Sequence, residues 1–127
     1  MLSKIGQIAI NVRDMERATA FFRDTMGLKF LFAAPNLAFF DAGGIWLMLS
    51  PPTEREFDHP ASLLYFDVDD IAAEHARMKS AGVEFRTEPH VVHRDATREL
   101  WLADFRDTEG NTFVLRSMKP LTAAPPA

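Results

Sequence analysis

The chain has no cysteine among its 127 residues, and this absence excludes several kinds of site at once. A disulfide framework, a thiolate metal ligand and a cysteine nucleophile all need that residue. Lys and Arg do not cluster and the formal net charge is −4, so we expect no nucleic-acid partner. No apolar run approaches the ~20 residues of a bilayer-spanning helix, so we expect no membrane partner. The first residues lack the apolar segment of a signal peptide, and we expect a cytoplasmic protein.

What the chain does have is an internal repeat. Residues 8–27 and 64–82 each contain an alternating apolar run, an Asp, an apolar-periodic stretch and a Gly. The matching positions are Val12 with Val68, Asp14 with Asp70, and Gly27 with Gly82. A strand–helix unit this short cannot cover its own sheet, so we expect two copies to pack around a shared interior.

Periodicity predicts two modules of the order βαβββ. In the first module we expect a helix over 15–26, capped by Asp14, and strands at 5–12, 28–33, 37–41 and 45–50. In the second we expect a helix over 70–81, capped by Asp69 or Asp70, and strands at 62–68, 83–87, 90–94, 98–103 and 112–116. The predicted organisation is a first module at 1–52, a linker at 53–61, a second module at 62–119 and a flexible tail at 120–127.

Three groups of motifs carry a family resemblance. The first module reads I-x-I-x-V-x-D, then A-x-x-F-F and G-L, and the second reads F-x-V-D-D, then A-G-V, with D-T-E-G-N before the closing strand. Over residues 5–117 the chain resembles the vicinal oxygen chelate superfamily, which includes glyoxalase I, bleomycin-resistance proteins and extradiol dioxygenases. The resemblance implies an α+β fold in which two βαβββ modules form a cup-shaped open barrel. It also implies a homodimer.

In metal-dependent members of that superfamily, one side chain from each of four strands holds a divalent ion on the floor of the cup. The resemblance puts these positions at Gln7, at Met48 or its neighbour Leu47, at Leu63 and at Val114. Only Gln7 offers a donor for a hard cation, and one neutral amide cannot hold a divalent ion. We therefore expect no metal and no cofactor at these positions.

The four histidines do not replace that set in the sequence. His59 falls in the linker, and we expect His75 on the solvent-exposed side of the second helix. His90 and His93 are an odd number of positions apart on one predicted strand, so we expect them on opposite faces rather than as a chelating pair.

Alternation also separates the residues under the helices from those lining the cup. We expect Leu100 and Leu102 to pack under the second helix with Phe113 and Leu115. The predicted ligand-binding residues on the opposite faces are Gln7, Asn11, Trp46, Met48, Tyr65, Trp101 and Arg116. A mostly apolar wall with few polar anchors is typical of a small-molecule pocket, and its flat rings can stack on a planar ligand. The alternative is that Trp46 and Met48 fill the cup as core.

One polar pair could carry chemistry. If residues 95–97 form a three-residue hairpin loop, His93 faces Glu99, and these two become the candidate catalytic acid and base. The alternative is a charge pair that only stabilises the hairpin.

Three functions therefore stay open. The first is a metal-free protein of the bleomycin-resistance type that binds a small planar or aromatic molecule. The second is a lyase, isomerase, epimerase or dioxygenase-type enzyme that uses His93 and Glu99 as acid and base, or as non-standard metal ligands. The third is a structural or interaction module with a filled cup.

Overall fold

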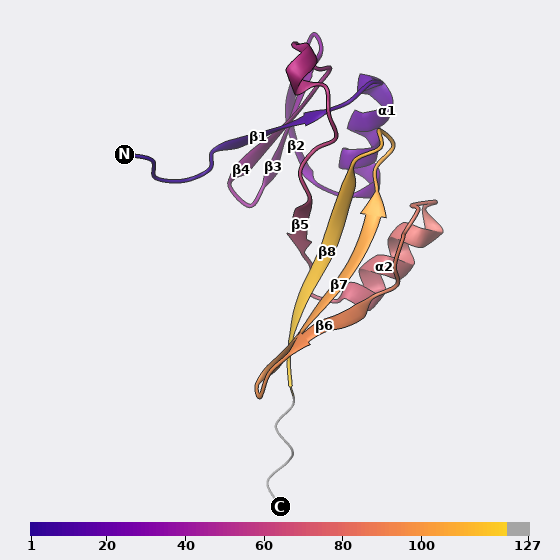
Figure 1. Cartoon of the computed structure of the whole chain (residues 1–127). Coiled ribbons are helices and arrows are strands. Elements are labelled where there is room, and N and C mark those ends of the chain that lie inside the picture. The colour runs from indigo at the N-terminus through magenta and orange to yellow at the C-terminus, as the bar shows by residue number, and fades with distance from the viewer. Residues whose placement is uncertain (122–127) are drawn as a thin grey trace, which may run out of the picture. The chain divides into compact units, whose positions relative to one another are not determined.

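The computed structural model describes residues 1–121 (Figure 1). The chain divides into two compact units, one formed by Met1–Ser62 with Asp107–Asn111 and the other by Leu63–Arg106 with the residues from Thr112 onward. From residue 122 on, the predicted tail lies outside the described residues. Within residues 1–121, every helix is too short or too polar to span a bilayer.

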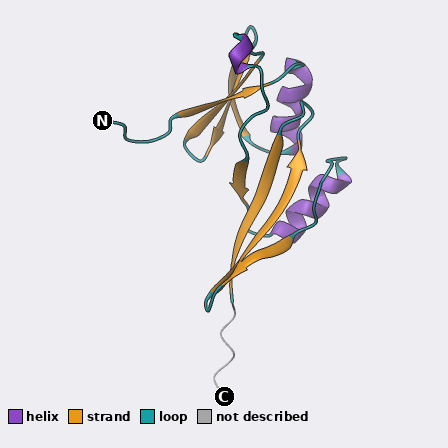
Figure 2. Cartoon of the chain, in the orientation of Figure 1, coloured by secondary structure: helices purple, strands orange, loops and turns teal. Residues whose placement is uncertain are grey.

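The first unit contains a four-stranded mixed sheet and a helix (Figure 2). The strand order is β1-β4-β3-β2, with β1 parallel to β4 and the other neighbours antiparallel. The elements are β1 (Gln7–Asn11), α1 (Met15–Ala20), the π-helical segment η1 (Phe21–Thr25), β2 (Lys29–Ala34), β3 (Leu37–Ala42), β4 (Ile45–Ser50) and the 3-10 turn η2 (Arg55–Phe57).

Local chemistry sets the bounds of the first helix. The Asp14 carboxylate accepts the Arg17 amide at 3.0 Å, and Gly27 takes the left-handed conformation (φ 74°) just after the helix. The π-helical turn follows where the Met26 amide bonds to the Phe21 carbonyl at 2.9 Å. Both Phe21 and Phe22 are buried, and the Phe22 ring packs on the sheet side chain Phe40 at 5.7 Å.

The second unit repeats this arrangement. Its strand order is β5-β8-β7-β6, with β5 parallel to β8. The elements are β5 (Leu64–Asp67), α2 (Ile71–Ser80), β6 (His90–Arg94), β7 (Arg98–Arg106) and β8 (Thr112–Pro120). Asp70, not Asp69, caps α2 by accepting the Ala73 amide at 3.1 Å, and Gly82 has a φ of 92°. The predicted α+β fold of two βαβββ modules is confirmed.

One predicted strand is wrong. Residues 83–87 form no named strand, and only Phe85 makes a bridge, to Phe105. The segment begins with the Val83 amide still bonded to the helix carbonyl of Met78, and it ends near Pro89, which has no backbone donor. These features leave room for only a short ladder against β7.

The predicted faces of β7 are also wrong. Residues paired across an antiparallel ladder point to the same side, and Phe105 pairs with Phe113. The same register places Trp101 opposite Ser117, Ala103 opposite Leu115 and Glu99 opposite Lys119. The Phe105 ring contacts Phe85, whose ring contacts His75 of α2, so this is the helix side of the sheet. Leu100 and Leu102 therefore lie on the side away from α2.

Candidate functional site

The side of the first sheet that α1 leaves uncovered carries four of the predicted ligand-binding residues. Ile10, Leu47 and Leu49 are buried, whereas the intervening positions alternate away from them. Gln7 and Asn11 of β1 therefore share this side with Trp46 and Met48 of β4, as the parallel register requires. The Gln7 side-chain amide donates to the Met48 thioether sulfur at 3.5 Å.

Three aromatic rings form a cluster on this uncovered side, which we call the aromatic face: Phe32, Phe39 and Trp46. The Phe32 and Phe39 rings stack with centroids 4.5 Å apart and 22° between their planes. Trp46 meets both at steep angles, 5.7 Å from Phe32 and 5.6 Å from Phe39. Phe32 remains 45% exposed and Trp46 40% exposed.

Alternation alone did not identify Phe32 and Phe39, because β2 and β3 are apolar on both sides. Their orientation follows from the ladder, in which Phe39 pairs with Met48 and with Phe32. A bulge between Phe30 and Phe32 lets β2 place Phe30 on the helix side and Phe32 on the aromatic face.

In the second unit the predicted ligand-binding residues are divided between two sides. Tyr65 and Arg116 lie away from α2; Tyr65 is 52% exposed, and Arg116 Nη1 pairs with Asp67 Oδ1. Trp101 lies on the helix side instead, where its indole nitrogen donates to Glu99 at 3.3 Å and Lys119 Nζ sits 4.4 Å from its ring centroid. Trp101 therefore does not share a surface with Tyr65 and Arg116.

The predicted pairing of His93 with Glu99 is wrong. The hairpin closes with a two-residue loop, because the Asp95 amide bonds to the Arg98 carbonyl at 3.1 Å and the Asp95 carboxylate accepts the Thr97 and Arg98 amides. Arg94 is consequently opposite Glu99, and His93 is opposite Leu100.

Glu99 is held by other groups in place of that histidine. Its carboxylate pairs with Arg94, and the hydrogen bond from Arg94 is the main reason that the pKa of Glu99 is lowered. His93 and Glu99 point to opposite sides of the sheet. The two side chains therefore do not form an acid–base pair.

Two further expectations about histidines need correction. His75 is half-buried rather than exposed, with its ring 4.4 Å from that of Phe85. His90 and His93 lie on the same side of the sheet, opposite Leu102 and Leu100. The cause is an extra residue in β6, which shifts the ladder between Val91 and His93.

The positions implied for a divalent metal do not fit one. Gln7 and Met48 hydrogen-bond to each other, Leu63 is an exposed hydrocarbon side chain, and Val114 is a buried one. Apart from the Gln7 amide, this set offers no donor for a hard or borderline cation. No group of three or more His, Asp or Glu side chains within residues 1–121 is arranged to hold a metal. We assign no metal chemistry to these four positions.

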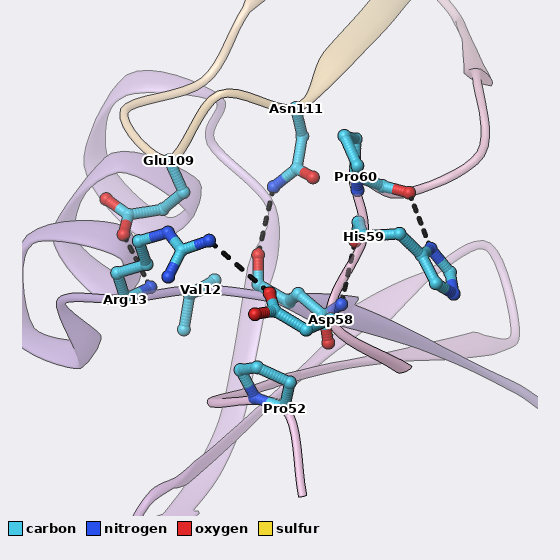
Figure 3. Close-up of a pocket in the computed structure, with 9 residues that line it drawn as sticks. Val12, Arg13, Pro52, Asp58, His59, Pro60, Glu109 and Asn111 are labelled. Carbon is cyan, nitrogen blue, oxygen red and sulfur yellow. Dashed lines mark hydrogen bonds and ion pairs between the residues drawn. The ribbon is translucent and has the colours of Figure 1, made fainter. Parts of the chain in front are cut away.

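A small cavity of about 110 Å3 lies elsewhere in the first unit (Figure 3). Its lining comes from the end of β1, the linker and the loop before β8: Asn11, Val12, Arg13, Pro52, Asp58, His59, Pro60, Glu109 and Asn111. The polar side chains around it are largely engaged with one another. Asn11 Nδ2 donates to the carbonyls of Phe57 and His59, and Arg13 Nη2 lies 3.3 Å from Asp58 Oδ1. These contacts attach the linker to the end of β1, and the cavity between them has room for only a few water molecules.

The D-T-E-G-N loop adds further hydrogen bonds to β1 and to the linker. Asn111 Nδ2 donates to the Asn11 carbonyl at 3.1 Å and to the Asp107 carboxylate at 2.8 Å, while Asn111 Oδ1 accepts the Ala61 amide at 2.8 Å. Asn111 is 1% exposed, so these bonds satisfy a buried amide. The sequence identified this loop only as a family motif before the closing strand and did not predict that role.

The two acids of this loop are shifted in opposite directions. Burial raises the pKa of Asp107, and its hydrogen bonds with the Asn111 side chain and the Asn111 and Glu109 amides only partly offset that effect. Burial would also raise the pKa of Glu109, but hydrogen bonds from Arg17, Thr108 and the amides of Asp14 and Arg13 outweigh it and lower the pKa to about 2. Glu109 is therefore negatively charged at neutral pH.

Comparison with known proteins agrees with this fold. A family model described as the Glyoxalase/Bleomycin resistance protein/Dioxygenase superfamily matches residues 4–115. The uncharacterized protein YetH of Bacillus subtilis (strain 168) is 27% identical over 128 residues, which cover 91% of this chain and 99% of that protein.

Two solved structures are similar across nearly the whole chain. A member of the same superfamily from Sphaerobacter thermophilus DSM 20745 has a TM-score of 0.72 at 21% identity, covering 91% of this chain and 98% of that one. The lactoylglutathione lyase from Agrobacterium tumefaciens has a TM-score of 0.71 at 22% identity, covering 92% and 95%. At these identities the likeness establishes the fold and leaves the activity open.

Proposed function

Because the chain belongs to the glyoxalase/bleomycin resistance protein/dioxygenase superfamily, we propose that it binds a small planar or aromatic organic molecule on the aromatic face without a metal ion. The observation that carries this proposal is the cluster of Phe32, Phe39 and Trp46 on a sheet surface that α1 leaves uncovered. Large apolar side chains gathered on a surface are typical of a binding site.

The ring geometry favours a flat ligand. The Phe32 and Phe39 rings stack on each other, and Trp46 meets both at steep angles while remaining 40% exposed. A planar ligand that stacks on the indole adds an aromatic contact worth roughly 0.5–1.5 kcal/mol beyond the area it buries. The cluster is held by three neighbouring strands, so little ordering is needed on binding.

Gln7 is the polar contact that we propose for the ligand. Its amide donates to a thioether, which is a weak acceptor, so a ligand carbonyl in that place would form a stronger hydrogen bond. Asn11 is less suited, because its amide already donates to the carbonyls of Phe57 and His59. We therefore expect specificity at Gln7 and structural support from Asn11.

The enzyme alternative that rests on His93 and Glu99 loses its basis. These side chains point to opposite sides of the second sheet, and Glu99 is paired with Arg94. No other described group pairs with His93 as a proton-transfer partner would, since Asp95 lies 3.9 Å away and bonds to its own loop.

The two tryptophans, Trp46 and Trp101, allow the proposal to be tested by fluorescence of single-tryptophan variants. The W101F variant leaves Trp46 as the single tryptophan, and W46F leaves Trp101 on the helix side of the other unit. A panel of neutral planar aromatic compounds is titrated while tryptophan fluorescence is recorded. We expect saturable quenching in W101F and none in W46F, and an affinity about tenfold lower in W101F/F32A, equal to about 1.4 kcal/mol. Equal quenching in W46F and W101F, or no saturation by any compound at about 1 mM, would overturn the proposal.

A further inference from the structure

The edge strand β6 contains a β-bulge that places two histidines on one side of the second sheet. His90 pairs with Leu102 and His93 with Leu100, while the extra residue between them has no partner on β7. Leu100 and Leu102 are two positions apart, so their partners share a side of the sheet despite the three-residue spacing of the histidines. In space, the H-V-V-H segment thus has the spacing of an H-x-H segment in a regular strand.

That spacing suits chelation. Two positions along a strand correspond to about 6.6 Å between backbone positions, within reach of two imidazoles that converge on one ion. Both side chains are exposed. Within the second unit β6 is the edge strand and pairs with β7 (Figure 1).

One of the two imidazoles has an oxygen partner at the nitrogen that would not bind metal. His90 Nδ1 lies 2.7 Å from the Glu88 carbonyl oxygen, which leaves Nε2 as the ligand atom. His93 Nε2 lies 3.9 Å from Asp95 Oδ2, which is beyond hydrogen-bond distance, so this contact does not decide which ring nitrogen of His93 would coordinate a metal. Histidines that ligate metals characteristically direct their second nitrogen to a carbonyl or carboxylate, which fixes the tautomer and the ring orientation.

We propose that His90 and His93 form a binding site for one divalent transition-metal ion, held through His90 Nε2 and one ring nitrogen of His93 with water in the remaining positions. Imidazole suits copper, nickel and zinc, and the absence of a thiolate or a third ligand makes the ion exchangeable. The site lies in the second unit and shares no residue with the aromatic face, so it stands independently of ligand binding there.

The test is calorimetric titration of the untagged protein with CuCl2, NiCl2 and MgCl2. We expect one equivalent of Cu2+ to bind more tightly than Ni2+, and no heat from Mg2+, which prefers oxygen ligands. H90Q and H93Q should each weaken binding at least about tenfold, because the loss of a ligand costs no less than the loss of its supporting partner. H59Q removes an exposed histidine of the linker and should bind as the wild type does.

A matched variant separates geometry from composition. The double substitution V91H/H93V keeps two histidines in β6 but moves one to the side shared with Trp101, so we expect the same loss as in H93Q. Circular dichroism confirms that each variant is folded. Unchanged Cu2+ affinity in H90Q, H93Q or V91H/H93V, or an equal loss in H59Q, would overturn the site.

Discussion

Glu109 closes the start of α1 by an ion pair with Arg17, a residue 92 positions earlier in the chain. Arg17 Nε lies 2.8 Å from Glu109 Oε2, and Glu109 Oε1 accepts the amides of Arg13 and Asp14 at 2.7 and 2.9 Å. The Glu109 side chain has no exposed surface. A negative charge at a helix N-terminus satisfies free amides and complements the helix dipole, so the loop from between β7 and β8 acts as a second cap beside Asp14.

Removing this charge should destabilise the protein. We expect E109Q to lower the free energy of unfolding by about 2 kcal/mol at pH 7, because the amide keeps the shape but weakens the bonds to Arg17 and the two amides. The folded pKa of about 2 lies below the ordinary 4.5, so the stabilisation is present above about pH 4.5 and is lost as pH falls towards 2.

Urea denaturation at pH 7 and pH 3 measures the effect. The free energy of unfolding should fall more for the wild type than for E109Q between pH 7 and pH 3. The two proteins should therefore differ less in stability at pH 3 than at pH 7. E84Q removes an exposed carboxylate of the second unit and serves as the control. A loss in E84Q equal to that in E109Q would contradict the capping role.

The loop should also reverse the usual order of two carboxyl groups. Asp ordinarily titrates below Glu, but burial raises the pKa of Asp107, whereas the bonds from Arg17, Thr108 and two amides bring that of Glu109 to about 2. The carboxyl carbon shifts of both residues, followed by NMR from pH 2 to 7, should show Asp107 titrating at the higher pH. The opposite order would mean that the loop does not hold Glu109 as described.

The cap of α2 gives a prediction with its own control. Asp70 accepts the Ala73 amide at 3.1 Å, whereas Asp69 offers only its backbone carbonyl, to Ser117. D70A should therefore cost about 1 kcal/mol, and D69A less than about 0.5 kcal/mol. Thermal unfolding of both variants makes the comparison, and equal shifts in Tm would show that the cap does not stabilise α2.

The repeated strand–helix unit could be predicted from the sequence, because the residues that begin and end each helix act on their immediate neighbours. Asp14 and Asp70 each form a bond to an amide three positions on, and Gly27 and Gly82 each adopt positive φ directly after a helix. Such features need no knowledge of the rest of the chain. The same holds for β1 and β4, where one side is polar or mixed and the other is apolar.

The errors arose where both sides of a strand are apolar or where one residue shifts a register. In β7, Leu100 and Leu102 alternate with Trp101, Ala103 and Phe105, so alternation could not decide which set faces α2. The pairing of Phe105 with Phe113 decides it, and that pairing depends on the length of the intervening loop. The two-residue turn and the bulge in β6 likewise each move the ladder by one position, which reversed two expectations about histidines.

Substitutions at Phe22 and Phe32 should distinguish a residue needed for stability from one needed for ligand binding. Phe22 has no exposed surface and packs against Phe21 and Phe40, so F22A should lower the free energy of unfolding by about 3–5 kcal/mol. Phe32 is 45% exposed and touches Phe39 and Trp46, so F32A should cost no more than about 1.5 kcal/mol.

Urea denaturation gives both stabilities, and Trp46 fluorescence in the W101F background gives ligand affinity for the folded F32A variant. Removing Phe32 should weaken the ligand while leaving most of the stability, because the ring lies on an uncovered surface. If F32A destabilised the protein as much as F22A does, Phe32 would be part of the core. The aromatic face would then be a packing surface rather than a ligand site.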